Sequence, residues 1–482
     1  MLPIPLDAIS EEQQWLKQLG LPQRNYLQRQ RFTGPVPAHS FLSPASWYRT
    51  EARDPVRVSD LLNDLPWLKL AMEAGYAAWE LLANRGWDWD DFFDRWTVAL
   101  RSQTHPTLTA VEAFGPFQLL VEYQLDNHTG VALPGVTAQH YSRSFFCTSG
   151  SQEAVSAVRN GLGQIFQMRA GDPANRLRET WLFENSELRR GYAFSCPSWY
   201  GAVEAVKSGG EWMSVTPAEN GAACILPAVY NRLSDEVAYL RISSLSPEAN
   251  EHLASFREWL PSDVRTAETL IIDVRGNQGG MHTGVLAMLH FITGQPVALS
   301  TTLRRKRSWL TPALTWGFLQ HKYAHLQHVA GPLQKYLRRA FDDLFAPPPP
   351  QTTFGEYRSP WCYGQHRFPS GRPRIIVVAD NASASDGEAL VYMLAAIPDT
   401  LVVGSDTAGV GEFTNPGYFI LPYTRIPFRI AMGISDIYGD GRSFEGYGLN
   451  PDILIPQLTD REPPQLLRLR EAVIAAGTGH LL

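Results

Sequence analysis

The sequence of 482 residues lacks several features that mark special classes of protein. It has only four cysteines, and none forms a Cys-x-x-Cys pair, which argues against a zinc ribbon or a disulfide framework. No apolar run approaches about 18 residues, so we expect no membrane span. The N-terminus lacks a basic segment followed by an apolar one, so we expect no signal peptide and a cytoplasmic location.

Charge is also sparse, because charged residues make up 19% of the chain and the formal net charge is −6. This mild balance gives no reason to expect nucleic acid as a partner. Apolar material is plentiful, with 44% hydrophobic residues, 14 Trp and 22 Phe. A chain of this length exceeds one ordinary hydrophobic core, so two or three domains are expected.

The hydrophobic pattern divides the chain into three regions. Residues 1–135 are predicted to be largely helical, because apolar side chains recur every three or four residues between Leu61 and Arg101. Residues 136–235 show no pattern from which a fold can be predicted. Residues 236–470 alternate strand and helix patterns, as in an α/β domain. Within this domain, 304–371 is predicted to be a helical insertion, since it is basic and ends in a proline-rich spacer.

The segment "IIVVADNASASDGEALVYML" contains the first candidate for chemistry. The run Ile375–Ala379 predicts a buried strand, and the spacing of Leu390 and Met393 predicts a helix after it. Ser385 would then lie near the helix N-terminus, where unpaired N–H groups favour developing negative charge. An acyl-transfer site needs this beside its nucleophile. Taken alone, the segment favours the other interpretation, in which Ser383 or Ser385 only caps the helix.

A second segment, "TLIIDVRGNQGG", places a glycine-rich turn after a predicted strand. Gly276, Gly279 and Gly280 allow close approach of the backbone and can direct N–H groups toward an oxyanion. The segment is neither a dinucleotide fingerprint nor a P-loop. Glycine turns after strands are common, so this motif alone is weak evidence for a site.

Together with two later segments, these motifs resemble the C-terminal processing peptidase family of serine proteases, peptidase family S41. The family's four ordered motifs match this chain at Asp273–Gly280, Ser383–Glu388, Val403–Gly409 and Glu445–Asp452. Four motifs in order over about 180 residues are far more specific than any one of them. The resemblance implies a mixed-sheet α/β catalytic domain similar to ClpP and crotonase, with a helical N-terminal domain and a helical insertion.

One difference distinguishes the branches of this family. The bacterial processing enzymes carry a lysine base after T-x-G, whereas this chain has Val410 there, which cannot take a proton. The tricorn-like branch uses Ser, His and Glu, and its histidine lies in an L-x-D-x-H-T segment. The chain has "LDNHTG", with His128 at that position, and Glu445 precedes the last motif. The resemblance therefore implies a triad of Ser385, His128 and Glu445.

The resemblance also implies the supporting groups. Backbone N–H groups of Gly279 or Gly280 and of Asp386 are the candidates for an oxyanion hole. Asn127 stands where tricorn protease has an accessory serine, so its role is left open. The implied activity is that of a serine endopeptidase acting through an acyl-enzyme on a peptide or protein, with no cofactor.

Other signals were interpreted without a functional role. His321, His325 and His328 would share one helical face, but no acidic or cysteine ligand lies in that segment, so no metal is predicted. The run Arg304–Arg307 is predicted to be a solvated face, with the steering of an acidic substrate or partner as the alternative.

Two rival functions stay open at this stage. The fold could serve binding of a small molecule or peptide without proteolysis, as a retinoid-binding member of the family does. Alternatively the same triad could pass the acyl group to an amine or hydroxyl, as a transferase or cyclase would. The sequence leaves open the substrate, the oligomeric state and the roles of residues 136–235 and of the insertion.

Overall fold

The computed structural model describes the following parts of the chain: residues 55–118, 126–132, 142–147, 153–168, 177–197 except 185, 202–218, 228–246, 266–280, 302–318 in part, 353–358, 373–436 except 398, 445–456 and 463–475. The chain forms two compact units, and each consists of three segments. Met1–Gln139, Thr302–Tyr357 and Phe413–Ser435 form the first unit. His140–Thr301, Arg358–Glu412 and Asp436–Leu482 form the second unit.

The first unit begins with the helices that the sequence predicts. Its described helices are α3 (Val58–Gly75), α4 (Trp79–Asn84), α5 (Trp89–Arg101) and α6 (Ala110–Ala113), and strands β1 (Val56–Arg57) and β2 (Thr107–Leu108) pair beside them. The start of α5 is capped by Asp88, whose side chain accepts the N–H of Asp91. Thr109 and Glu112 form a capping box at α6.

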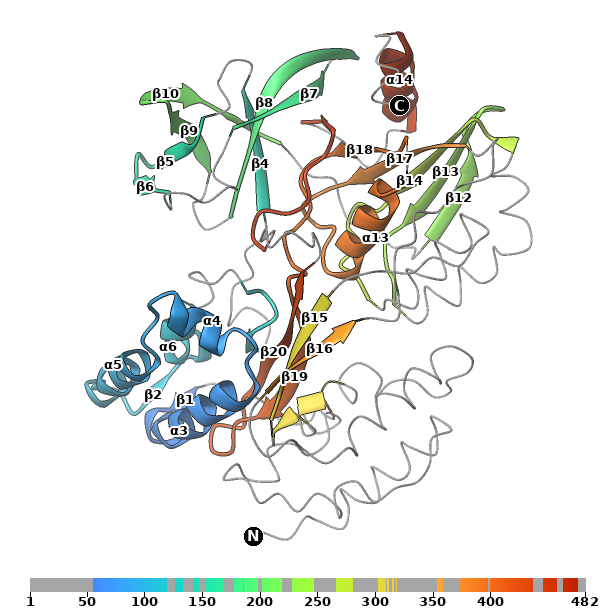
Figure 1. Cartoon of the computed structure of the whole chain (residues 1–482). Helices are drawn as coiled ribbons and strands as arrows, with labels where there is room; N and C mark the ends of the chain where they lie inside the picture. The colour runs from blue at the N-terminus through green and yellow to red at the C-terminus, as the bar shows by residue number, and fades with distance from the viewer. Residues whose placement is uncertain are drawn as a thin grey trace, which may run out of the picture. The chain divides into compact units, whose positions relative to one another are not determined.

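A sheet completes the first unit (Figure 1). Its strands are β16 (Thr353–Arg358), β15 (Thr302–Arg307), β20 (Pro427–Asp436) and β19 (Phe413–Ile420), with β3 (Gly130–Val131) paired to β20. The core between helices and sheet is rich in aromatic side chains. Phe117 and Phe428, for example, meet edge to face with ring centroids 4.9 Å apart.

A buried carboxylate on α3 holds the turn between β19 and β20. Asp64 is fully buried and accepts the N–H groups of Tyr423 and Thr424 at 2.9 and 2.8 Å. It also accepts the Thr424 hydroxyl at 2.6 Å. Burial raises the pKa of Asp64 to about 6. The Asp64 carboxylate therefore fastens a helix to a hairpin more than 350 residues away in sequence.

The basic run Arg304–Arg307 differs from its prediction, because it lies in strand β15 and one of its side chains is buried. Lys306 is fully buried and forms an ion pair with Glu80 of α4 at 2.8 Å. Burial lowers the pKa of Lys306, while Glu80 acts in the opposite direction. The prediction of a solvated face is therefore wrong at Lys306. Most of the remaining predicted insertion, including His321, His325 and His328, lies outside the described residues.

The second unit is built on a ten-stranded mixed sheet with the order β11-β4-β8-β7-β21-β18-β17-β14-β13-β12. The parallel centre contains β7 (Arg178–Glu184), β21 (Ile453–Leu454), β18 (Leu401–Gly404), β17 (Arg374–Ala379), β14 (Thr269–Asp273) and β13 (Val237–Ile242). Antiparallel strands extend both sides: β12 (Ala228–Arg232), β8 (Glu187–Pro197), β4 (Ser142–Cys147) and β11 (Thr216–Pro217). The predicted mixed-sheet α/β fold is thus confirmed.

Helices cover both faces of this sheet, which explains why its central strands are apolar throughout. Leu270 and Ile272 of β14 share a core with helix α13 (Asp386–Ala395) on one face. Ile271, between them, shares a second core with helix α14 (Pro463–Ala475) on the other. Residues 248–260 and 285–293, where the alternating pattern of this domain predicts helices, lie outside the described residues.

Residues 136–235, for which the sequence predicts no fold, form strands where the structure describes them. Strands β10 (Glu211–Ser214), β9 (Val203–Ser208), β5 (Val155–Asn160) and β6 (Ile165–Gln167) form a four-stranded sheet in that order. Val158 and Val206 of this sheet share a core with Phe145 and Phe194 of the large sheet. The Gly209-Gly210 turn between β9 and β10 is a hairpin signal that sequence reasoning missed.

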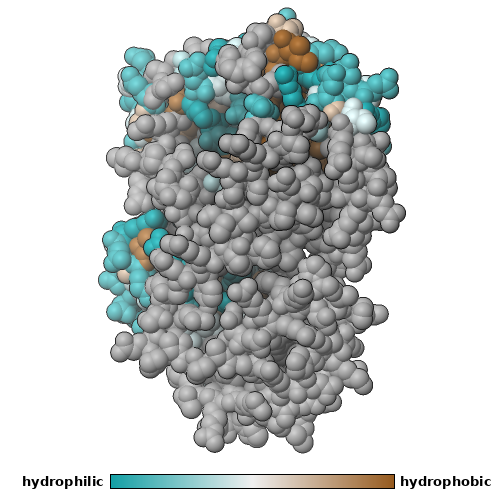
Figure 2. All heavy atoms as spheres, turned by 45° about the vertical axis from the view of Figure 1, so that its right-hand side comes forward, coloured by the Kyte–Doolittle hydropathy of each residue, from teal (hydrophilic) through white to brown (hydrophobic). Residues whose placement is uncertain are grey.

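The described surface carries few large apolar side chains. Those with the greatest exposure are Val98, Val111, Leu162, Ile165, Tyr423 and Ile474. The face drawn in Figure 2 is mostly hydrophilic where it is described, with apolar side chains gathered in small areas. None of the described helices combines the length and the apolar character needed to cross a membrane.

Candidate active site

Ser385 lies where the sequence places it, between strand β17 and helix α13. It is the residue preceding the helix and has φ 55° and ψ −122°. A positive φ is costly for any residue other than glycine, so the surrounding contacts must hold it. The N–H of Ser385 donates to the carbonyl of Val410 at 2.7 Å and lies 3.1 Å from a carboxylate oxygen of Glu388. A strained strand-to-helix turn also presents the nucleophilic serine of other hydrolases.

Ser383, the other serine of the motif, has a different role. It is fully buried, and its hydroxyl donates to the carbonyl of Val274 at 2.9 Å. Asp380 accepts the N–H groups of Gly276 and Ala382 at 3.0 and 3.1 Å. These bonds join the serine turn to the glycine-rich turn after β14. Ser383 therefore does not cap α13, whereas Ser385 is the N-cap residue of the helix and its N–H donates to Glu388 as in a capping box.

The glycine-rich turn lies directly against the serine turn. A Cβ on Gly279, whose φ is 90°, would lie 2.7 Å from the Asp386 nitrogen and 2.9 Å from the Ser385 Cβ. Gly387 is equally confined, because a Cβ there would overlap the Asn277 carbonyl oxygen. Only glycine permits this approach. The structure therefore brings the predicted oxyanion-hole segment of Gly279 and Asp386 to Ser385.

Asn277 controls one of these N–H groups and was not singled out from the sequence. It is fully buried, and its side-chain oxygen accepts the N–H of Gly279 at 2.9 Å. Its amide nitrogen donates to the carbonyl of Ile242 at 3.0 Å. The Gly279 N–H therefore has an acceptor in this structure, and it would have to leave Asn277 to bind an oxyanion. Gly280 forms a parallel bridge with Leu245.

The Asp-x-Arg part of the same motif is structural. Asp273 is fully buried and forms an ion pair with Arg275 at 2.6 Å. The Tyr239 hydroxyl donates to Asp273 at 2.6 Å, and burial raises the pKa of Tyr239, so it stays protonated. These partners satisfy a carboxylate that would otherwise be costly to bury.

Glu388 is the most extensively hydrogen-bonded side chain of the serine turn. It is fully buried, and one oxygen accepts the Thr407 hydroxyl at 2.5 Å and the Gly409 N–H at 2.8 Å. The other accepts the N–H groups of Val410 at 2.7 Å and Ser385 at 3.1 Å. Burial raises the pKa of Glu388 to about 7, although all these donors act in the opposite direction. The motif contains this residue, but the sequence indicated no role for it.

Val410 stands where the bacterial processing enzymes carry a lysine base after T-x-G. Its side chain is 6% exposed and packs with Ala384 and Ala408. Its backbone accepts from Ser385 and donates to Glu388, so the residue supports the turn by its main chain.

Glu445 is attached to the segment that follows Val410. It is 1% exposed, and one carboxylate oxygen accepts the N–H groups of Gly411 at 3.0 Å and Glu412 at 2.8 Å. The N–H of Gly446 donates to the carbonyl of Gly409 at 2.7 Å. Ser385 and Glu445 are thus bonded to adjacent residues of one loop within the second unit.

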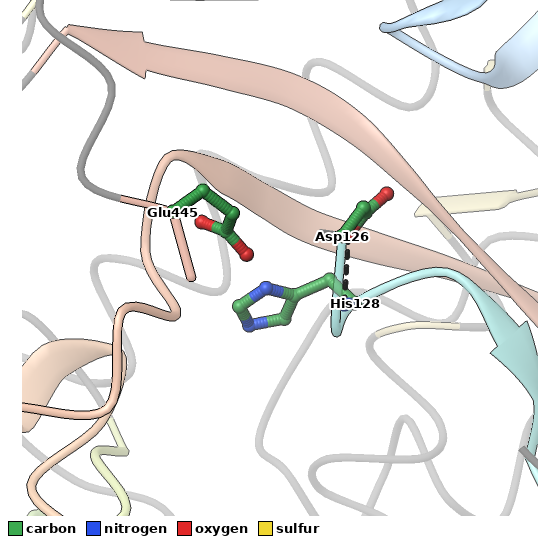
Figure 3. A group of neighbouring side chains, drawn as sticks. All are labelled: Asp126, His128 and Glu445. Carbon is green, nitrogen blue, oxygen red and sulfur yellow. Dashed lines mark hydrogen bonds between the residues drawn. The ribbon is translucent and has the colours of Figure 1, made fainter. Parts of the chain in front are cut away.

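His128 belongs to the first unit, in a loop before β3 (Figure 3). Its N–H donates to a carboxylate oxygen of Asp126 at 2.7 Å, and burial raises the pKa of Asp126. Thr129 accepts the N–H of Ala431 at 2.9 Å, and the Asn127 carbonyl accepts from Arg429 at 3.0 Å. Strand β20 therefore fixes the loop, and Asn127 takes part through its backbone.

Comparison with known proteins supports the same class. Residues 236–455 match the model of peptidase family S41, and no curated protein matches the chain. Among solved structures, mature CPAF complexed with lactacystin shares 15% identity over 87% of this chain and 98% of that one, with a TM-score of 0.47. The photosystem II D1 C-terminal processing protease shares 11% identity over 87% and 98%, with a TM-score of 0.36.

Tricorn protease shares 11% identity over 87% of this chain and 37% of that one, with a TM-score of 0.38. With TM-scores below 0.5, these three similarities carry no weight for the site. The chain is a serine peptidase. Its segment 236–455 is similar to peptidase family S41.

Proposed function

We propose that this chain is a serine endopeptidase of the C-terminal processing type, with a Ser-His-Glu arrangement. Ser385 is the nucleophile, His128 the general base and Glu445 the carboxylate that orients the imidazole. The observation that supports this most is the Ser385 turn, strained at φ 55° and packed against the glycine-rich turn of Gly279.

The proposed reaction follows from the chemistry of these groups. The imidazole of His128 takes the hydroxyl proton of Ser385 as the oxygen attacks the scissile carbonyl. The N–H groups of Asp386 and of Gly279 or Gly280 stabilise the oxyanion, and Gly279 releases Asn277 to do so. The proton then passes to the leaving amine, and an acyl-enzyme forms. Water then attacks the acyl-enzyme while His128 takes its proton, and the proton returns to the Ser385 oxygen as the acyl product leaves as a carboxylic acid.

The substrate is a peptide or protein, and the chain acts in the cytoplasm without a cofactor, a nucleic acid or a membrane. Asn127 acts as an accessory to His128 by fixing its loop, since its carbonyl is held by Arg429.

A fluorophosphonate probe tests this proposal. We expect the folded wild-type protein to be labelled at Ser385, as located by peptide mass spectrometry, and Ser385→Ala to remain unlabelled. An unlabelled but folded wild-type protein would favour a binding protein instead. Cleavage of a peptide library by wild type, compared with Ser385→Ala, then defines the substrate. Digestion in heavy-oxygen water distinguishes hydrolysis from transfer of the acyl group to an amine or hydroxyl, because only hydrolysis places solvent oxygen in the product.

A further inference from the structure

Glu388 has a geometry that the proposed triad does not explain. It is a carboxylate in the first turn of α13, fully buried, with four donors on its two oxygens. A charged group is buried at a large cost unless such donors compensate it. The donors come from the serine turn itself and from the loop Thr407–Val410.

We propose that Glu388 is a positioning residue for Ser385, an inference that rests on the proposed function. One oxygen holds the N–H groups of Ser385 and Val410 together, while the Val410 carbonyl accepts the same Ser385 N–H. This closed set of bonds fixes the strained backbone of Ser385 relative to the adjacent loop. Without it, Ser385 is free to relax toward an ordinary φ and to carry its hydroxyl away from the base.

The second oxygen of Glu388 connects the serine turn to the segment that carries Glu445. The Thr407 hydroxyl, which donates to Glu388, accepts the N–H of Leu449 at 2.7 Å. Gly409 donates its N–H to Glu388 and accepts the N–H of Gly446 through its carbonyl. The Glu388 carboxylate thus holds both the backbone of Ser385 and the segment next to Glu445 in place.

Replacement of Glu388 by glutamine should disturb this arrangement with little change of shape. Glutamine offers one oxygen and one NH2 group, so its NH2 must face N–H donors on one side. Either the Ser385 and Val410 pair or the Gly409 N–H then loses its acceptor. Aspartate keeps the charge but is one methylene shorter, so it cannot reach both sets of donors at once.

The experiment compares Glu388→Gln and Glu388→Asp with wild type by the rate of fluorophosphonate labelling at Ser385 per folded molecule. Displacement of a reacting group by about 1 Å costs roughly 100-fold, so we expect that loss for glutamine and about tenfold for aspartate. In peptide cleavage, kcat should fall while KM stays within about threefold, because the inference concerns the nucleophile and not substrate binding.

Asp64→Asn is the matched control. Asp64 is likewise fully buried and accepts two backbone N–H groups and a threonine hydroxyl, but at a hairpin of the first unit. The Asp64→Asn substitution should lower the melting temperature yet leave the rate of labelling at Ser385 within about twofold of wild type. Folded Glu388 variants that label at the wild-type rate overturn the inference and leave the proposed function intact. If Glu388→Gln fails to fold, Glu388→Asp decides. An unlabelled wild type overturns both.

Discussion

At the scale of single residues, the four sequence motifs act mainly by close packing and buried hydrogen bonds. Gly387 shows this for packing, because its position beside the Asn277 carbonyl leaves no room for a side chain. Gly387→Ala should lower the free energy of unfolding by about 1–3 kcal/mol, the usual cost of overpacking. Urea unfolding measures the loss. Gly115→Ala is the control, since no atom lies within 4 Å of its Cβ position, and it should be neutral or stabilising.

Glu388 should also make stability depend on pH. Its pKa is about 7 in the folded protein against 4.5 for the free side chain. Because the folded pKa is raised, its contribution to stability is fully present below about pH 4.5 and is lost as the pH rises through 7. Over that window the contribution is on the order of 3 kcal/mol.

Urea unfolding from pH 5 to pH 8 measures this dependence. Wild type should lose stability more steeply with rising pH than Glu388→Gln, which has no titrating group at that position. Parallel curves for the two proteins would show that Glu388 does not titrate in this range.

The position of Ser385 could be predicted because it depends on local pattern, a strand run followed by helical spacing. The roles of Glu388 and Asn277 could not, because their partners lie far along the chain. Asn277 bonds Ile242, 35 residues away, and Glu388 bonds Thr407 and Gly409. No spacing rule connects such residues until the sheet has formed.

At the scale of elements, the ion pair between buried Lys306 of β15 and half-exposed Glu80 of α4 carries the clearest prediction. Removal of Glu80 leaves the Lys306 ammonium buried without its half-exposed carboxylate partner, so Glu80→Ala should cost about 1.5–3 kcal/mol. Lys306→Met removes the charge and keeps the volume, so its stability should equal or exceed that of wild type. Urea unfolding of both variants checks the order. A larger loss for Lys306→Met would mean that the pair itself stabilises the fold.

Helix α14 should stabilise the second unit through one face only. Leu469 is fully buried against the large sheet, whereas Ile474 on the same helix is 50% exposed. Leu469→Ala should cost about 2–5 kcal/mol, the range for a buried leucine, and Ile474→Ala below about 1 kcal/mol. Thermal or urea unfolding of the two variants makes the comparison. Equal losses of stability in the two variants would show that Leu469 does not pack in the core.

Among the elements, the long periodic ones were predictable and the short ones were not. Helices α3 to α5 and strands β14 and β17 follow clear apolar patterns. Strands β6 and β10 have only three and four residues and are largely exposed, so their pattern is weak. Strand β15 falls in the segment predicted to be a helical insertion, and its basic run was predicted to face solvent, although Lys306 is buried and paired with Glu80 of α4.

At the scale of the whole molecule, both units are assembled from segments far apart in sequence. The sequence predicted contiguous regions at 1–135, 136–235 and 236–470, with an insertion at 304–371. The structure instead groups Thr302–Tyr357 and Phe413–Ser435 with the N-terminal helices. A hydrophobic pattern shows which face of a segment is buried but not which other segment covers it. This is why the mixed-sheet class was predictable and the interleaving was not.

We propose that His128 activates Ser385 as its general base. The most direct test is the rate of fluorophosphonate labelling at Ser385 in wild type, His128→Ala and Glu445→Gln, with melting curves to confirm folding. Loss of the general base should slow labelling by about 100-fold to 10,000-fold in His128→Ala, with a smaller loss in Glu445→Gln. Labelling of folded His128→Ala at the wild-type rate would contradict the account.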